Sequence, residues 1–339
     1  MMPAPSSAPP FLEAQALTKW FKVRPSRPFE AVRTVHATTG VSFHVAAGRT
    51  LGIVGESGCG KSTLARLLMN LIPPDEGRVL IDGEAIGQDR AQQKAHRRTM
   101  QMVFQDSYAS LNPRMTIEDS IMFGPRVHGV RRSEARDRAY DLLGKVGLDS
   151  VRFATRYPHE LSGGQRQRVN IARALALQPR ILILDEAVSA LDKSVQAQVL
   201  NLLLDLKSEF ELTYLFISHD LNVVDYISDR VLVMYLGKVV EEGPVDRLYS
   251  AARHPYTRAL LASMPSNDPD HRTLAAPIQG DMPSPIDPPS GCRFRTRCPF
   301  AEDVCAQREP KLLVHQDHAV ACHIEQPDSG HSHRGKAIP

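Results

Sequence analysis

One short segment limits the folds open to this chain more than any other: Gly55-Glu56-Ser57-Gly58-Cys59-Gly60-Lys61-Ser62-Thr63. It follows an aliphatic run, Thr50 to Val54, and precedes a helical pattern, Thr63 to Leu71. Glycines let the backbone wrap around phosphate oxygens, and the following helix directs its N–H groups and dipole at the negative charge. The spacing matches GxxxxGK[ST], so Lys61 is predicted to reach the β- and γ-phosphates of a nucleotide and Ser62 to bind Mg²⁺.

A second segment indicates the metal-binding side of a nucleotide site. Asp185-Glu186 follows four aliphatic residues, Ile181 to Leu184, which are typical of a buried strand. A carboxylate at the carboxyl end of such a strand lies where open α/β sheets bind ligands. Asp185 is therefore assigned to Mg²⁺ and Glu186 to polarising the attacking water. Taken alone, the segment is equally typical of a buried strand that ends in an acidic turn.

The third segment, Leu161-Ser162-Gly163-Gly164-Gln165, predicts a second phosphate-binding surface. Ser162 is a favourable helix N-cap, and the two glycines allow a phosphate to approach the backbone closely. One ATP needs only one such cradle, so the second is interpreted as serving a nucleotide held by another subunit. A capped helix after a glycine turn is the structural alternative.

Taken together, residues from about Phe11 to Gly243 resemble the ATP-binding-cassette ATPases. The resemblance implies that Gln105 senses Mg²⁺ and the attacking water, and that His219 contacts the γ-phosphate. It also places a stacking aromatic for adenine on the first strand, where Phe21 fits best and Trp20 second. Finally, it implies that one group acts in trans on the partner's ATP: Ser162, Gly163, Gly164, Gln165 and Asp192.

The expected fold is α/β. Aliphatic strand candidates (Thr50–Val54, Ile181–Leu184, Leu212–Ile217 and Val231–Tyr235) alternate with helical patterns, which indicates a parallel sheet covered on both faces. The resemblance adds an antiparallel β subdomain and a helical subdomain at about 106–161. We expect the ATPase domain at 11–250, an extension at 251–325, and disordered ends at 1–10 and 326–339.

Four of the five cysteines, Cys292, Cys298, Cys305 and Cys322, lie close together near the C-terminus. A chain of this kind is expected in a reducing compartment, where clustered thiols indicate a metal site more often than disulfides. The spacing Cys-x5-Cys-x6-Cys-x16-Cys has no CxxC knuckle, so a [4Fe–4S] cluster is favoured over Zn²⁺ or unligated thiols. This tail also resembles the cluster-bearing tail of peptide-importer ATPases.

The segment His254 to Leu261 resembles the extension of oligopeptide and dipeptide importer ATPases, and 103–113 and 214–221 resemble the second of their two unlike ATPase subunits. The resemblance implies two permease subunits, a sibling ATPase and an extracytoplasmic binding protein as partners. Nickel chelates or glutathione stay open as cargo. A soluble cassette ATPase of chromosomes or ribosomes is the rival, although only 56 residues (106–161) separate Gln105 from Ser162, too few for a coiled-coil insertion.

Composition adds two exclusions. The formal net charge of +3 is too small to indicate nucleic-acid binding. The chain shows neither a secretory signal nor an apolar run long enough to span a membrane. We therefore expect a cytoplasmic protein that reaches the inner face of the membrane through its partners.

Overall fold

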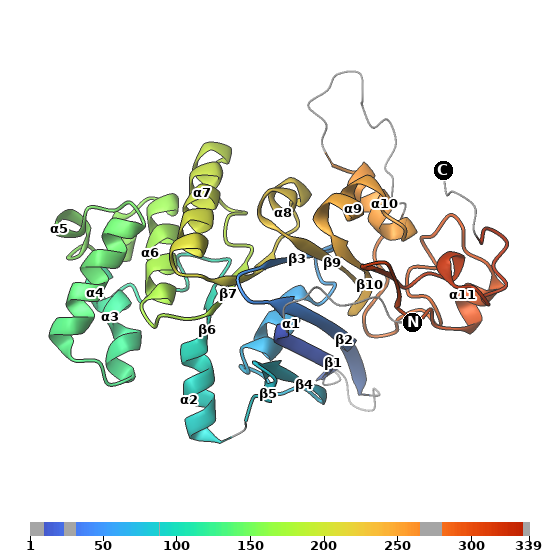
Figure 1. Ribbon diagram of the computed structural model, residues 1–339, viewed down its shortest axis with the longest axis horizontal. Coiled ribbons are helices and arrows are strands. Elements are labelled where there is room, and N and C mark those ends of the chain that lie inside the picture. Colours follow the sequence, from blue (N-terminus) through green and yellow to red (C-terminus); the bar gives the residue numbers. More distant parts are fainter. Residues whose placement is uncertain (1–9, 24–31, 88, 265–279, 335–339) are drawn as a thin grey trace. The chain divides into compact units, whose positions relative to one another are not determined.

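The computed structural model describes residues 10–23, 32–87, 89–264 and 280–334 (Figure 1). The chain divides into two compact units, one made of residues 1–44, 51–85 and 219–339, the other of residues 45–50 and 86–218. Disorder was expected for residues 1–10, of which 1–9 lie outside the described part, whereas Pro10 begins strand β1.

The first unit contains an antiparallel sheet in the order β2-β1-β4-β5. Its strands are β1 (Pro10–Val23), β2 (Arg33–Ala46), β4 (Glu76–Ile81) and β5 (Glu84–Ala85). Along β2, buried Val41, Phe43 and Val45 alternate with exposed residues, as expected when one face of a sheet covers a core. Helix α1 (Lys61–Leu68) packs against β1.

The same unit holds β3 (Thr50–Val54), β9 (Arg230–Tyr235) and β10 (Lys238–Pro244). Strand β3 is buried along its whole length and pairs with β9 in parallel, with Val54 opposite Val233. Because β3 runs directly into the glycine-rich segment and α1, that segment starts at the carboxyl end of a parallel strand. Helices α8 (Leu221–Ile227), α9 (Val245–Ser250) and α10 (Pro255–Ala262) complete this part.

The cysteine-rich region extends the β9–β10 pair. It contains α11 (Asp303–Gln307), β11 (Leu313–His315), β12 (His318–Val320) and η2 (His323–Glu325). Strand β12 pairs antiparallel with β10, with Glu241 opposite Val320, and β11 pairs with β12.

One fully buried carboxylate links strand β10 to the start of α10 and to strand β12. Glu241 of β10 accepts hydrogen bonds from the backbone N–H groups of Arg253 (2.6 Å) and His254 (3.0 Å), and its Oε1 lies 2.7 Å from Nε2 of His318. Buried charge is tolerated only when it is paired and hydrogen-bonded. Glu241 therefore fixes the start of α10 and strand β12 on the same strand, β10.

The expectation that 326–339 is disordered is wrong for residues 326–334. His331 is only 4% exposed, and its Nε2 lies 2.9 Å from the carbonyl oxygen of Phe300. The polar composition of this segment indicates disorder, but composition cannot predict that one imidazole is buried and makes a specific hydrogen bond. Residues 335–339 lie outside the described part.

The second unit is built on three parallel strands, β6 (Met100–Val103), β7 (Ile181–Asp185) and β8 (Thr213–Ile217). Strands β7 and β8 are buried throughout. The unit also contains α2 (Arg90–Thr99), α6 (Gly163–Leu175) and α7 (Lys193–Glu209). Between β6 and α6 lie α3 (Ile117–Val127), α4 (Arg132–Lys145), α5 (Ser150–Phe153) and η1 (Pro158–Glu160), with α3, α4 and α6 packed together (Figure 1).

Among the described residues, we find no helix with the length and apolarity needed to cross a bilayer.

The buried His254 predicts a stability loss in mild acid. Burial lowers the pKa of His254 to about 4, a shift that the nearby Glu241 only partly opposes. In the unfolded chain His254 therefore binds a proton near pH 6.5, whereas in the folded chain it stays neutral at that pH. The free energy of unfolding falls as the pH drops below 6.5. Between pH 7 and pH 5 the free energy of unfolding should fall by about 2 kcal/mol.

Urea unfolding at both pH values checks this. His254→Asn keeps an N-cap acceptor without titrating, so it should remove this part of the pH dependence. The exposed His159→Asn is the control and should leave the dependence intact. Equal pH dependence in the wild type and His254→Asn would contradict the assignment.

Candidate functional site

The glycine-rich loop after β3 needs glycine at its two ends. Gly55 has φ +149° and Gly60 has φ +109°. A Cβ on Gly55 would lie 2.2 Å from the carbonyl oxygen of Met234, and one on Gly60 would lie 2.2 Å from that of Ala37. Because both neighbours are backbone atoms, no side chain can be accommodated at either position.

The lysine of the loop lies inside its curve. Lys61 is 6% exposed, and its ammonium donates to the carbonyl oxygens of Gly55 (2.6 Å) and Glu56 (3.0 Å). Ser62, in the first turn of α1, is exposed, as are Ser57 and Gly58. Cys59 is buried, and burial raises its thiol pKa, so this thiol is neutral near pH 7. The loop thus offers one cation, backbone N–H groups and an exposed hydroxyl, which suits a polyphosphate with a divalent metal.

Two aromatic side chains stand exposed near the end of β1. Trp20 is 37% exposed and Phe21 is 38% exposed, and Nζ of Lys19 lies 5.8 Å from the centre of the Phe21 ring. Either ring can stack on a base. His219 is exposed as well and directly precedes Asp220, which caps α8 through the N–H of Asn222.

The extension also contacts the glycine-rich loop, through hydrogen bonds that the sequence did not indicate. The backbone N–H of Glu56 donates to the Tyr256 hydroxyl (2.9 Å), and Nη1 of Arg297 donates to both carboxylate oxygens of Glu56 at 2.9 and 3.0 Å. The Tyr256 ring packs against Tyr235 and Phe294, with centroids 4.7 and 5.3 Å away. Arg297 precedes Cys298 in the chain, so one short segment contacts the loop and also carries one of the four clustered cysteines.

The acidic pair after β7 belongs to the second unit. Asp185 is 7% exposed at the last position of the strand. Glu186 has φ +48°, a conformation that non-glycine residues rarely adopt and that is often found at functional sites. Its carboxylate accepts a 2.6 Å hydrogen bond from Nε2 of Gln105. The structure therefore brings together two of the residues expected to handle the attacking water.

The glycine turn at Ser162 begins α6 as a capping box. The N–H of Gln165 donates to Oγ of Ser162 (3.3 Å), and the N–H of Ser162 donates to Oε1 of Gln165 (3.0 Å). Ser162 is exposed, while Gly163 and Gly164 are partly buried. A Cβ on Gly164 would lie 2.5 Å from Cγ1 of Val195 on α7. The helix start thus presents backbone N–H groups, and the Gln165 side chain orders the turn.

Asp192 lies immediately before α7 and is exposed. Its side chain makes no capping hydrogen bond to that helix. This weakens the alternative in which Asp192 is simply a helix cap.

The four clustered cysteines line one pocket together with His254, Phe294, Phe300 and His331. All four are free thiols. Burial raises the pKa of Cys292 to about 12 and that of Cys298 to about 11, and it also raises the pKa of Cys322. Converging thiols in an apolar pocket ionise only with a cation to hold them, so this donor set fits a thiolate-ligated metal or iron–sulfur cluster.

Comparison with known proteins identifies related chains. Residues 38–189 match the family model described as ABC transporter, and residues 240–305 match that described as Oligopeptide/dipeptide transporter, C-terminal region. A probable peptide ABC transporter ATP-binding protein of Sinorhizobium fredii is 52% identical over 93% of this chain and 90% of its own. The oligopeptide transport ATP-binding protein AppF of Bacillus subtilis is 48% identical over 92% of this chain and 97% of its own.

Solved structures show the same fold. CbiO1 of Clostridium perfringens, part of an ABC transporter complex, has a TM-score of 0.61 at 28% identity and covers 71% of this chain and 91% of its own. The ATP-binding cassette MJ0796, a dimer bound to ADP and phosphate, has a TM-score of 0.61 at 31% identity and covers 69% of this chain and 98% of its own.

The contact between Arg297 and Glu56 predicts a coupling between the extension and the loop. Arg297→Met leaves the Glu56 carboxylate without its cation, so we expect a loss of about 2 kcal/mol in unfolding free energy and weaker ATP binding. Urea unfolding and nucleotide titration measure both. Arg136→Met is the control, because the Arg136 side chain is 57% exposed in its ion pair with Glu118 and should contribute little. Equal effects of the two substitutions would contradict the coupling.

Proposed function

Because this chain belongs to the ATP-binding proteins of the ABC transporter family, we propose that it is the ATP-hydrolysing subunit of a dipeptide or oligopeptide importer. One observation carries the proposal: the chain has two glycine-framed helix starts, at Lys61 and at Gly163. Each helix start suits a phosphate, and only the first has a lysine beside it. The peptide cargo is inferred from the extension and from the relatives that carry it.

Each residue around the nucleotide has a specific role in this proposal. Lys61 binds the β- and γ-phosphates, with the N–H groups of residues 55–63 around them, and Phe21 stacks on adenine. Ser62, Asp185 and Gln105 hold Mg²⁺, which would offset charge on the phosphates. Glu186 accepts a proton from the attacking water, which Gln105 helps to orient. His219 contacts the γ-phosphate. The positive φ of Glu186 and its bond to Gln105 support this assignment.

The second helix start acts on a nucleotide held by a sibling ATPase. Ser162, Gly163 and Gly164 close over the γ-phosphate of that nucleotide, and Asp192 lies at the same interface. The capping box supports this role because it orders the turn before any ligand arrives. Two such domains would close around ATP and separate after hydrolysis.

A pair of exposed apolar side chains on α3 supports docking to a permease. Phe123 and Val127 lie one turn apart on α3 and are 60% and 58% exposed. Neighbouring exposed apolar side chains favour a surface that binds a partner. Through this surface the chain would bind permease subunits, which place it at the inner face of the membrane.

The role of Glu186 predicts a specific defect. Glu186→Gln keeps the hydrogen bond to Gln105 possible but removes the base, so ATP turnover should fall at least about a hundredfold while nucleotide still binds. ATP-dependent pairing with the sibling ATPase should become longer-lived. Phosphate release and light scattering measure the two effects. Glu211→Gln, in the exposed turn before β8, is the control. Unchanged turnover in Glu186→Gln would remove this residue from the mechanism.

We assign the four-cysteine pocket to a [4Fe–4S] cluster, with Zn²⁺ as the alternative. Cys292, Cys298, Cys305 and Cys322 would be its ligands, and a bound cluster would supply either structural cross-linking or a redox-sensitive state. Because Arg297 joins the pocket to Glu56, the cluster would stabilise the segment that supports the phosphate loop.

Protein purified without oxygen should contain iron and acid-labile sulfide and absorb broadly in the visible range, where Zn²⁺ is silent. Cys298→Ser should lose the iron, the sulfide and the visible absorption. Cys59→Ser should keep all three, because the Cys59 thiol lies in the phosphate loop. Stoichiometric zinc without sulfide would establish the alternative instead.

A further inference from the structure

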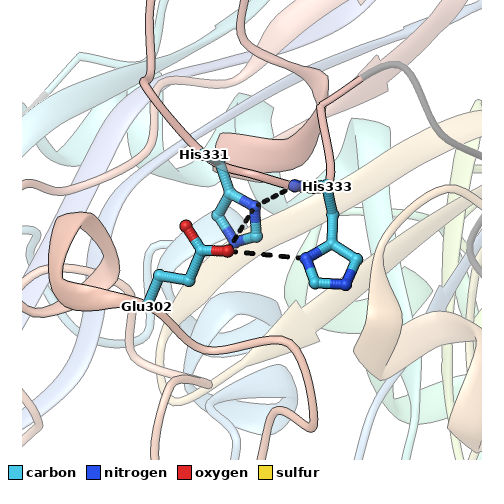
Figure 2. Close-up of side chains that lie close together, drawn as sticks. All are labelled: Glu302, His331 and His333. Carbon is cyan, nitrogen blue, oxygen red and sulfur yellow. Dashed lines mark hydrogen bonds and ion pairs between the residues drawn. The ribbon is translucent and has the colours of Figure 1, made fainter.

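Three side chains that can bind a metal meet beside the cysteine pocket, and one of them, His331, also lines it. Glu302 directly precedes α11, and His331 and His333 lie on the segment that follows η2 (Figure 2). One ligand atom from each lies within 4.8 Å of the other two. None of the three is assigned to the nucleotide site, and none is one of the four cysteines.

The buried histidine is oriented as a ligand. Nε2 of His331 lies 2.9 Å from the Phe300 carbonyl oxygen, which can only accept, so Nε2 carries the proton. Nδ1 then has a lone pair, and it lies 3.5 Å from Oε1 of Glu302. The backbone N–H of His333 donates a 3.2 Å hydrogen bond to this lone pair, so an ion bound at Nδ1 would replace that bond. Metal-binding histidines commonly donate their second ring N–H to a carbonyl in this way.

The carboxylate is fixed as well. Oε2 of Glu302 accepts from the N–H of Ser332 (3.0 Å), and Oε1 accepts from the Ser332 hydroxyl. Nδ1 of His333 lies 3.4 Å from Oε1 of Glu302 and 3.2 Å from the Ser332 hydroxyl. These bonds hold Glu302 ionised, with its pKa lowered to about 2.

Two of the three ligand separations suit a small divalent ion, and the third is within 4.8 Å. Ligands at about 2.0–2.1 Å from a tetrahedral centre lie about 3.3–3.4 Å from one another. The Glu302–His331 and Glu302–His333 distances of 3.5 and 3.4 Å are close to this value. His333 is the adjustable member, because its side chain is 43% exposed while that of His331 is 1% exposed.

We propose that Glu302, His331 and His333 form a second metal site, which binds a divalent first-row transition ion such as Zn²⁺, Co²⁺ or Ni²⁺. Two imidazole nitrogens and one carboxylate oxygen prefer these ions over Mg²⁺ or Ca²⁺, and water would complete the coordination. The donor set differs from that of the cysteine pocket, which takes soft, thiolate-bound metals. Because His331 also lines that pocket, an ion here would fix the segment that covers it.

Cobalt titration separates the two sites. Full-length protein without a polyhistidine tag, with its cysteine site as isolated, is titrated with Co²⁺ while the absorption spectrum is recorded. Binding through nitrogen and oxygen gives weak visible bands, whereas thiolate ligation adds intense charge-transfer bands. We expect one equivalent of Co²⁺ without thiolate bands, and affinity at least about tenfold lower in His333→Ala and in Glu302→Gln. Both side chains are partly exposed, so the variants should fold.

His159→Ala is the control, because His159 is exposed and belongs to the other unit. It should bind Co²⁺ as the wild type does. The proposal is overturned if cobalt binds only with thiolate bands, or if all variants bind alike. In that case Glu302 and the histidines form only an ion-pair cluster.

Discussion

The close approach of the backbone at Gly55 and Gly60 is the constraint on which the rest of the site depends. At both positions another carbonyl oxygen occupies the space that a Cβ would need. Only this approach lets the chain leave β3, curl around Lys61 and begin α1 within a few residues. The extension then holds the loop from outside, since Tyr256 and Arg297 both bind Glu56. The extension therefore stabilises the loop from its outer side, within the first unit.

A buried charge supports that arrangement at a distance. Glu241 binds the start of α10, which carries Tyr256, and it also contacts His318 on β12, the strand that leads to Cys322. One carboxylate thus positions both the tyrosine beneath the phosphate loop and part of the cysteine pocket. These contacts give a physical route by which a tail far from the ATP motifs in sequence would influence nucleotide binding.

Local motifs could be predicted from the sequence because their function requires fixed spacing. The loop before Lys61, the strand ending at Asp185 and the capped turn at Ser162 all stand where the pattern indicated. Aliphatic strands such as β7 were recognisable because they are buried on both faces. Helix α2 was missed because its sequence, RAQQKAHRRT, has almost no apolar residues and only His96 is buried. The contacts of Arg297, Glu241 and His331 were missed because each joins residues distant in sequence, which no local spacing records.

The proposed mechanism depends most on contact between the helix that begins at Gly163 and a nucleotide held by another subunit. The direct measurement is a structure of this chain with its sibling ATPase, Mg²⁺ and a non-hydrolysable ATP analogue. We expect the N–H groups of Gly163 and Gly164 within hydrogen-bond distance of the γ-phosphate of the analogue on the sibling. If those groups instead faced solvent, or contacted only nucleotide held by Lys61 of the same chain, the proposed mechanism would be contradicted.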